Sequence, residues 1–409
     1  MAISRKADVV IAGGGMVGMS LAIALARQGI RTVVADTLAP ATTLDAKFDG
    51  RVSALSYSSI RMFRALGVWA AMEPHAQPIQ DILVTDAKLD GTPSPFSLHF
   101  DSAEIGEPMG AIVENRYTRT ALIGAAQDVR DLEFIAPAAV TRVETEGTRA
   151  IAHLSNGMEV EASLAVACEG RESPLRDAAG IGIVAWSYAQ WGIVATVAHE
   201  KPHEGVAYEH FLPSGPFAIL PMTGNRSSLV WTERDDLAPA MMKLSDEDFE
   251  AEVARRFGAH LGATRIDGPR WSYPLRFHLA RSYVRDRFAL AGDTAHGIHP
   301  IAGQGLNLGL KDAAALAETV LDAARLGLDI GNLQSLKRYE RWRRFDSFTM
   351  AMAMDGLNRL FSNDIAPVRA LRDIGLGIVD GIGPLRRFFM RHAGGDIGKL
   401  PRLLKGEAA

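Results

Sequence analysis

Three glycines near the beginning of the chain have the type and spacing that bind phosphate. Gly13, Gly15 and Gly18 form a G-x-G-x-x-G pattern between an apolar run and a segment of helical character. In such a turn the first glycine permits the bend, the second lets a pyrophosphate approach the backbone, and the third lets helix and strand pack closely. Asp36 follows roughly 20 residues later, where a carboxylate binds a ribose hydroxyl. The pattern predicts a dinucleotide site, with a glycine-rich turn in an unrelated α/β protein as the alternative.

A second group of such residues lies near residue 300. Gly292 and Asp293 follow a short apolar run, and Gly303, Gly305 and Gly309 lie at the start of the next predicted helix. A carboxylate at a strand end can bind a sugar-like hydroxyl, and a glycine-rich helix start can receive pyrophosphate or the carbonyl edge of a ring. Two such elements, far apart in sequence, suit one long dinucleotide. Close helix packing for the glycines and an N-cap role for Asp293 are the alternatives.

The other chemistry-bearing residues fit different enzyme classes poorly. His296 and His299 have neither a carboxylate cluster nor a third histidine beside them in the sequence, so we predict no metal site. The single cysteine, Cys168, ends an apolar run and is expected to be a buried small residue rather than a nucleophile. The chain contains neither a G-x-S-x-G nucleophile elbow nor a P-loop.

The segment from His299 to Asp312 resembles the signature of the ubiquinone-biosynthesis hydroxylases, a branch of the class A FAD monooxygenases. It reads His-Pro-Ile-Ala-Gly-Gln-Gly-Leu-Asn-Leu-Gly-Leu-Lys-Asp. The resemblance covers nearly the whole chain. Its other parts are the Gly13 motif, Asp49-Gly-Arg51-Val-Ser-Ala54-Leu, Glu114-Asn-Arg-Tyr-Thr-Arg119, Glu169-Gly170, Gly292-Asp293 and the late helices.

The resemblance implies FAD as the cofactor and roles for several residues. Arg51 and Arg119 are implied to line the FAD path, with a surface charge as the alternative for Arg51, and Asp293 is implied to bind the ribitol-pyrophosphate region. The predicted cofactor-binding residues are Gly13, Gly15, Gly18, Asp36, Arg51, Arg119, Glu169, Gly170, Gly292, Asp293, Pro300, Gly303, Gly305 and Asn307. The residues implied to lie beside the isoalloxazine ring are Pro300, Gly303, Gln304 and Gly305. No catalytic side chain is assigned.

One position departs from the family pattern. The family usually has Asp-Gly where this chain has Glu169-Gly170, a position tied to the pyrophosphates of FAD and of the pyridine nucleotide. Glutamate keeps the charge but reaches farther by one methylene, so the electron donor is left open between NAD(P)H and another reductant. Arg176, after Ser173, is in the family's usual place, where it either faces the nucleotide or forms a salt bridge on the following helix.

The order of elements predicts an α/β (α+β) fold. A strand over 8–12, a helix over 16–28 and a strand over 31–35 form one βαβ unit, and a small antiparallel meander is expected over 132–168. Further helices are predicted over 56–66, 115–127, 246–257 and 303–326, the third behind a Ser245 cap, and the chain is mostly helical from residue 333 onward.

We expect three parts. The first is a Rossmann-like FAD-binding domain of the p-hydroxybenzoate hydroxylase type, formed by residues 1–80, 106–180 and 281–330. The second is an inserted β-sheet substrate domain of residues 81–105 and 181–280, and the third is a C-terminal helical region of residues 331–409.

Composition and charge narrow the class further. The 409 residues, 47% of them apolar, can bury a large core, and a formal net charge of -4 gives no basic field for binding nucleic acid. A single cysteine excludes an internal disulfide framework and fits a reducing cytoplasm. Residues 9–26 are uncharged and just long enough to suggest a membrane span, but a strand-turn-helix unit explains their glycines, so we predict no transmembrane segment.

The implied reaction is reduction of FAD, formation of a flavin C4a-hydroperoxide with dioxygen, and transfer of one oxygen atom to an electron-rich phenolic ring. In ubiquinone biosynthesis the substrate is a polyprenylated phenol. An apolar lining must exclude water from the site. Its candidates, each with core packing as the alternative, are Trp186, Tyr188, Trp191, Phe211, Phe217 and Trp231.

The C-terminal part mixes basic and apolar residues. We expect it to contact an anionic inner membrane or a quinone-biosynthesis complex, with an ordinary surface helix as the alternative. Its basic residues are Arg386, Arg387, Arg391, Lys399, Arg402 and Lys405. Two other functions stay open at this point: a monooxygenase of a small soluble phenol or a flavin oxidase, and an FAD-bound scaffold of a quinone-biosynthesis complex.

Overall fold

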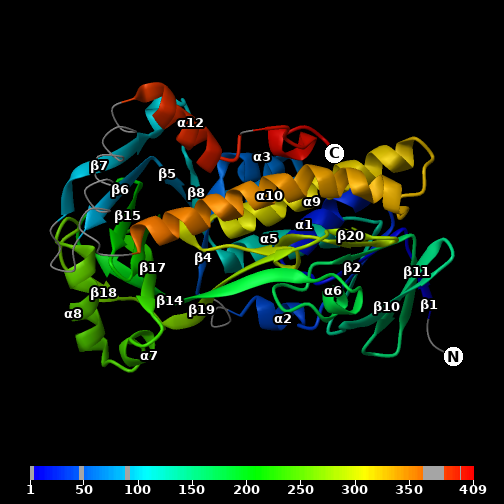
Figure 1. Cartoon of the computed structure of the whole chain (residues 1–409), viewed down its shortest axis with the longest axis horizontal. Coiled ribbons are helices and arrows are strands. Elements are labelled where there is room, and N and C mark those ends of the chain that lie inside the picture. Colours follow the sequence, from blue (N-terminus) through cyan, green and yellow to red (C-terminus); the bar gives the residue numbers. More distant parts are fainter. Residues whose placement is uncertain (1–3, 46–49, 88–92, 363–381, 397) are drawn as a thin grey trace.

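The computed structural model describes residues 4–45, 50–87, 93–362, 382–396 and 398–409 (Figure 1). One layer is a six-stranded sheet in the order β20-β21-β13-β2-β3-β9, parallel except that β20 runs antiparallel to β21. Its strands are β2 (Val9–Ala12), β3 (Thr32–Ala35), β9 (Leu132–Ile135), β13 (Leu164–Ala167), β20 (Val284–Arg285) and β21 (Phe288–Leu290). The predicted βαβ unit is confirmed.

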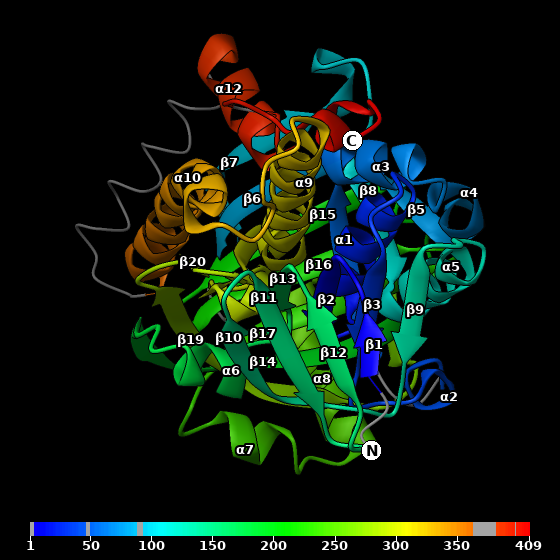
Figure 2. The same ribbon diagram turned by 90° about the vertical axis from the view of Figure 1, so that its right-hand side faces the viewer.

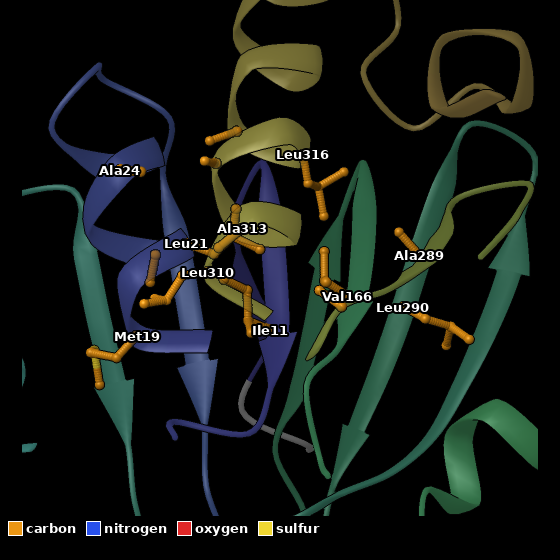
Figure 3. Packing of buried hydrophobic residues seen from close by; sticks show 14 of the residues in the cluster. Ile11, Met19, Leu21, Ala24, Val166, Ala289, Leu290, Leu310, Ala313 and Leu316 are labelled. Carbon is orange, nitrogen blue, oxygen red and sulfur yellow. The ribbon is translucent and has the colours of Figure 1, made fainter. Parts of the chain in front are cut away.

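Two helices pack together on one face of this sheet. They are α1 (Met16–Ala26) and α9 (Gln304–Arg325), which Figure 2 shows side by side. Every residue of α1 from Gly18 onward is buried, because the helix lies between the sheet and other helices, which explains why it is apolar all round. Figure 3 shows side chains of both helices meeting Ile11 and Val166 of the sheet.

An antiparallel meander packs near the same sheet, as the sequence predicts. It consists of β10 (Val140–Glu146), β11 (Arg149–Leu154) and β12 (Glu159–Ala162), with β1 (Ser4–Lys6) parallel to β12. Both expected ends of the meander, 132 and 168, are wrong, however. Residues 132–135 form β9, which pairs in parallel with β3, and residues 164–167 form β13, which pairs in parallel with β2 and β21, so both strands belong to the six-stranded sheet.

A nine-stranded sheet forms the second large layer, at the left of Figure 1. Its order is β22-β19-β14-β17-β16-β15-β6-β7, with β18 beside β14. The strands are β6 (Asp81–Ala87), β7 (Pro93–Asp101), β14 (Ile183–His199), β15 (Val206–Leu212), β16 (Gly215–Met222), β17 (Arg226–Arg234), β18 (Thr264–Ile266), β19 (Trp271–Ala280) and β22 (His296–Gly297).

One face of this sheet is covered by α8 (Asp246–Phe257), beside the short helix α7 (Ala238–Met241). The Ser245 hydroxyl accepts a hydrogen bond from the Asp248 N–H at 3.1 Å, so the predicted cap is confirmed. We call this covered side the outer face. The opposite, inner face packs against the rest of the molecule.

A three-stranded sheet that the sequence did not indicate connects the two large layers. It contains β4 (Val52–Ser56), β8 (Gly110–Glu114) and β5 (Ala76–Ile79), with β8 between the other two. Near it in the chain or in space lie α3 (Tyr57–Ala65), α4 (Trp69–Met72), α5 (Asn115–Gln127), η1 (Glu73–His75) and η2 (Ser102–Glu104). Two short helices lie elsewhere: α2 (Pro40–Thr43) contacts α5, and α6 (Pro174–Ala178) contacts β10 of the meander.

The C-terminal part is helical where the structure describes it. Helix α10 (Leu333–Phe361) runs along the length of the molecule (Figure 1) and packs on α9, and α12 (Gly383–Ala393) and η5 (Arg402–Lys405) follow. Residues 363–381 of the region predicted to be helical lie outside the described residues. Within the described ranges, we find no helix with the length and apolarity needed to cross a membrane. The division into three domains stays a prediction, which the composition of the sheets supports.

Candidate functional site

The three glycines of the first motif have different surroundings. A methyl group on Gly13 would lie 2.4 Å from the Cys168 carbonyl oxygen, and one on Gly18 would lie 2.0 Å from the Gly13 carbonyl oxygen. Gly13 also has a φ of +103°, a backbone conformation that residues other than glycine rarely adopt. Around Gly15, by contrast, no described atom lies within 4 Å of such a methyl group. Gly15 therefore faces open space, where a phosphate could approach.

Asp36 lies at the end of β3 beside this turn. Its Oδ2 accepts a hydrogen bond from the Gly14 N–H at 2.6 Å, and its Oδ1 accepts one from the Leu38 N–H at 2.8 Å. The carboxylate is therefore fixed next to the glycine turn and half-buried. This is the place that the sequence predicts for a ribose-binding carboxylate.

The fold brings the second motif against the first. A methyl group on Gly309 of α9 would lie 2.7 Å from Val17 Cγ2 of α1 and 3.2 Å from the Gly292 Cα atom, so these three elements touch. Gly303 caps α9 in the left-handed conformation, with a φ of 62°, and lies against Ala54. A methyl group on Gly305, the second residue of α9, would meet no described atom within 4 Å.

The helix starts fit the phosphates of a dinucleotide. Neither α1 nor α9 has a side chain hydrogen-bonded at its N-cap or an acidic residue in its first turn. Their first N–H groups and the positive ends of their dipoles are therefore available to an anion. Gly15 and Gly305 leave backbone accessible at these two starts, so the residues present fit FAD.

A buried ionic network supports the second motif. Asp312 of α9 is fully buried, and its Oδ2 accepts hydrogen bonds from the Gly292 N–H at 3.0 Å and from His296 Nε2 at 2.5 Å. Its Oδ1 accepts one from Arg343 Nε at 2.8 Å. Burial by itself would raise the pKa of Asp312, but His296 and Arg343 outweigh this effect and the pKa is lowered. Asp312 therefore stays charged and holds the turn at Gly292.

Sequence reasoning did not give Asp312 this role. The residue closes the signature segment, but its partner Arg343 lies 31 residues farther along the chain. The sequence signal was therefore present in the motif, whereas the charge partner could come only from the packing of α10 on α9.

The Glu169-Gly170 loop lies against the same turn. The Gly170 N–H donates a hydrogen bond to Thr294 Oγ1 at 3.2 Å, next to Asp293 in η3 (Gly292–Thr294). The Ser173 hydroxyl donates one to Glu169 Oε2 at 2.5 Å. Burial raises the pKa of Glu169, although the hydrogen bond from Ser173 opposes the rise. The glutamate thus lies at the start of α6 and within the predicted site.

Arg176 has a structural role in this loop. Its side chain is buried and donates hydrogen bonds to the Arg171 and Thr294 carbonyl oxygens at 2.8 and 3.3 Å, and it forms a salt bridge with Asp177 at 3.0 Å. Of the two interpretations left open by the sequence, the structure favours the salt bridge. The cation that lies near the exposed Asp293 carboxylate is instead Arg171, at 3.7 Å.

The remaining predicted residues lie near α5 or at the start of α9. Arg51 lies beside the start of α5, where its carbonyl oxygen accepts a hydrogen bond from the Asn115 N–H at 3.0 Å, and Arg119 lies farther along that helix. Their roles toward FAD stay predictions, and Asp49 of the same motif lies outside the described residues. Pro300 and Gln304 flank η4 (Ile301–Gly303) at the start of α9.

Asn307 was predicted to bind the cofactor, but its side chain is occupied inside the protein. The side-chain oxygen accepts hydrogen bonds from the Ser56 N–H at 3.0 Å and the Ser59 hydroxyl at 2.8 Å, and Nδ2 donates to the Ala54 carbonyl oxygen at 2.9 Å. The residue is buried. We therefore assign the Asn307 side chain a positioning role, because its hydrogen bonds connect α9 with β4.

His299 is the most unusual polar side chain of the motif. It is 1% exposed, and neither ring nitrogen has a hydrogen-bond partner among the residues that the structure describes. Its ring packs edge-on against Tyr188 of β14, with 5.0 Å between ring centroids. Burial lowers the pKa of His299 to about 3. A neutral imidazole with unused nitrogens is thus held directly beside Pro300, and leaving such atoms unpaired is costly.

The aromatic candidates divide between the two faces of the nine-stranded sheet. Phe217 and Trp231 lie in the core under α8, and Trp191 packs against that core, so core packing explains these three. Trp186 stacks on Phe277 at 3.8 Å, and Phe211 stacks on Phe361 of α10 at 4.0 Å. Trp186 and Tyr188 also line a cavity of about 690 Å³ with Gln190, Ser214, Asn358 and Arg359.

Comparison with known proteins identifies the class. The FAD binding domain family matches residues 6–344. A relative from Rhodospirillum rubrum, named ubiquinone hydroxylase UbiL, is 50% identical over 98% of this chain and 93% of its own length. The 3-demethoxyubiquinol 3-hydroxylase of Escherichia coli is 32% identical over 95% of this chain and 99% of its own length.

A solved structure shows the same fold. The p-nitrophenol 4-monooxygenase PnpA of Pseudomonas putida has a TM-score of 0.78 at 17% identity and covers 97% of this chain and 99% of its own. Fold, glycine motifs and matches together define an FAD-dependent monooxygenase. Within that class, the chain belongs to the family of the ubiquinone-biosynthesis hydroxylases.

Proposed function

We propose that this protein inserts one oxygen atom from O₂ into the ring of a polyprenylated phenol on the pathway to ubiquinone. The observation that carries the proposal is 50% identity, over 98% of the chain, to a protein named ubiquinone hydroxylase. The open backbone at Gly15 and Gly305 supports FAD as the bound group, because both glycines lie at uncapped helix starts. The electron donor stays open between NAD(P)H and another reductant.

When bound, FAD supplies the electron transfer and the activation of dioxygen. The protein binds and orients the cofactor and the substrate, and it excludes water from the site. The N–H groups at the starts of α1 and α9 would hold the pyrophosphate, and Asp36 would bind the ribose. Asp312 keeps the Gly292 turn in place through its 3.0 Å hydrogen bond. Pro300 to Gly305 would lie along the ring system, as the family resemblance implies.

The inner face of the nine-stranded sheet is the proposed substrate side. It faces the Gly303 segment through Ala54, and its aromatic rings Trp186, Tyr188 and Phe211 can exclude water from the reacting centre. A long prenyl tail needs an apolar path out of such a site.

We further propose that the protein works in the cytoplasm in contact with the inner membrane or with a quinone-biosynthesis complex, through α12. Phe388 is 53% exposed and lies between the exposed Arg387 and Arg391. Arg386 and Arg402 form close ion pairs with Glu104 and Asp322, at 2.6 and 2.5 Å, whereas Arg387 lies farther from Glu104, at 3.9 Å. Lys399 and Lys405 are exposed as well, but they lie outside α12. We choose α12 as the contact because its exposed cations flank an exposed aromatic ring.

Liposome flotation tests the membrane part of this proposal. Truncation of the tail is a poor test, since Leu403 and Leu404 of η5 are buried in the core. The double variant Arg387→Glu/Arg391→Glu leaves η5 intact and should abolish flotation with anionic vesicles. Unchanged flotation of this variant would exclude α12 as the contact.

The main test is product analysis in a quinone-deficient bacterial host. Wild-type protein should restore quinone, and its absence should accumulate a prenylphenol lacking one oxygen. Gly15→Ala and Asp293→Ala, both at the predicted FAD site, should restore less. If no quinone intermediate changes while the purified protein still carries FAD, the proposed pathway is wrong and only the class of enzyme stands.

A further inference from the structure

Glu209 is an acidic residue in the middle of the nine-stranded sheet. It lies on β15, opposite Val84 of β6 and Ala218 of β16 in the strand register. Residues two apart on a strand share a face, so Glu209 points to the same side as Ala207 and Phe211. All four of these neighbours are apolar. Glu209 is therefore an isolated carboxyl in an apolar wall.

This wall is the inner face of the sheet. Ala207 belongs to a buried cluster with Ile79, Met109 and Ile112, against which Ala54 also packs. Ala54 in turn is the residue that Gly303 touches, with 2.9 Å between the Ala54 Cβ atom and a methyl group placed on Gly303. The neighbour of Glu209 along the strand thus belongs to the apolar cluster that packs against Ala54, the contact of the flavin-adjacent segment.

The other end of the wall is closed by aromatic rings. Phe211, the next residue on the same face, stacks on Phe361 at the end of α10. Glu209 is half-buried and lies between this pair and the Ala207 cluster, about 6.7 Å along the strand from each neighbour. Its carboxyl is the polar group that this stretch of β15 presents toward the proposed substrate side.

Glu209 has no hydrogen bond or ion pair in the part of the chain that the structure describes. Burial alone raises the pKa of its carboxyl to about 8. A carboxyl held this way destabilises the folded protein until it gains a partner, as expected for a group that serves a ligand. The raised pKa makes this carboxylate a stronger base than an ordinary glutamate. It also brings the pKa of the carboxyl closer to that of a phenol, which is about 10, so that transfer of the phenol proton is less unfavourable.

We propose that Glu209 is a catalytic residue that contacts the substrate, binding the phenolic hydroxyl of the ring and accepting its proton during oxygen transfer. In this step the O–H bond breaks, the electron pair stays on the phenolic oxygen and the proton moves to a carboxylate oxygen. The ring becomes more electron-rich and so a better acceptor of the oxygen atom. When the ring then loses its C–H proton and becomes aromatic again, the phenolic oxygen regains a proton.

This inference rests on the proposed function, so its test begins with the wild-type protein. Dithionite-reduced protein with a short-chain prenylphenol is mixed with oxygenated buffer, which avoids any choice of electron donor, and hydroxylated product and hydrogen peroxide are measured in one turnover. Glu209→Gln keeps the size of the side chain but cannot accept the proton. Glu247→Gln, the same change at an exposed position of α8, is the matched control.

Glu209→Gln should retain FAD and lower the rate of hydroxylation by about 10²- to 10⁴-fold, with peroxide replacing product. Glu247→Gln should behave as wild type, and Glu209→Asp should recover part of the rate. If the wild type hydroxylates the prenylphenol and Glu209→Gln does so equally well, the role of Glu209 is wrong and the proposed function stands. If the wild type itself forms no hydroxylated product, both proposals fail.

A second measurement does not depend on the variant folding. Wild-type protein should bind the prenylphenol at least tenfold more tightly than its O-methyl ether, because only the free hydroxyl can donate to Glu209. Equal affinities for the phenol and the ether would overturn the assignment.

Discussion

Alanine at Gly15 and alanine at Gly18 should affect the protein differently, although both glycines belong to one motif. In Gly15→Ala the added methyl group meets no described atom within 4 Å, and Gly15 has a φ of -65° that alanine readily adopts. The free energy of unfolding of the FAD-free protein should therefore change by less than about 0.5 kcal/mol. FAD affinity should still fall, because the methyl group occupies the phosphate approach. Loss of one charge-assisted hydrogen bond, worth about 1.5–3 kcal/mol, predicts a Kd about 10- to 150-fold higher.

Gly18→Ala should behave differently. Its methyl group would lie 2.0 Å from the Gly13 carbonyl oxygen, where an ordinary contact needs 3.4 Å, so α1 must move by the difference of 1.4 Å. Because the clash is with backbone, no side chain can rotate away, and the cost should reach about 3 kcal/mol of unfolding free energy. FAD affinity should fall too, since α1 carries the phosphate-binding start.

Urea unfolding without FAD and fluorescence titration with FAD separate the two effects. The expected pattern is loss of affinity alone for Gly15→Ala and loss of both stability and affinity for Gly18→Ala. A destabilised Gly15→Ala together with a normally stable Gly18→Ala would show that the packing of this turn has been assigned to the wrong glycine.

Further predictions concern buried polar groups. Asp312→Asn breaks a buried ion pair and should lower the unfolding free energy by about 3–5 kcal/mol in urea titrations; a loss below 1 kcal/mol would contradict the network. His299→Leu removes unpartnered nitrogens and should leave stability equal or higher while hydroxylation falls; unchanged turnover would show that the imidazole serves no ligand. Burial lowers the pKa of His210 and His278 to about 4 and that of His299 to about 3, whereas an unfolded chain takes up these protons near pH 6.5. Stability should therefore fall as pH drops below about 6.5, by at most about 4 kcal/mol per pH unit, and a flat stability profile from pH 7 to pH 4 would refute neutral burial. The pKa of Glu209, raised to about 8, predicts that Glu209→Gln stabilises the protein more at pH 9 than at pH 5, and the reverse order would mean that the carboxylate has a charge partner.

The glycine motif could be predicted from the sequence because its geometry is local. Gly13, Gly15 and Gly18 lie within one turn, and the strand and helix around them are short-range structures. The same holds for α5 and α8, whose predicted bounds agree with the structure. The placement of Asp36 followed from the length of one βαβ unit.

Roles that depend on distant partners could not be predicted in this way. Asn307 is taken up by hydrogen bonds to residues about 250 positions earlier, and Asp312 needs Arg343. For Glu209, alternation along β15 leaves two faces equally possible. The parallel pairing of β15 with β6, more than 100 residues away, places β15 inside the nine-stranded sheet. Only the packing of that whole sheet decides that the face carrying Glu209 is the inner one.

Helix α10 couples the binding of FAD to the binding of the phenol. Its 29 residues span about 43 Å, and it is fixed at three levels: Tyr339 donates a hydrogen bond to the Leu290 carbonyl oxygen at 2.7 Å, Arg343 binds Asp312, and Phe361 stacks on Phe211. The helix therefore fixes the distance between the Gly292 turn and the inner face of the nine-stranded sheet, the proposed substrate side. Ordering of either end restricts the other, so FAD and the phenol should each bind more tightly when the other is present.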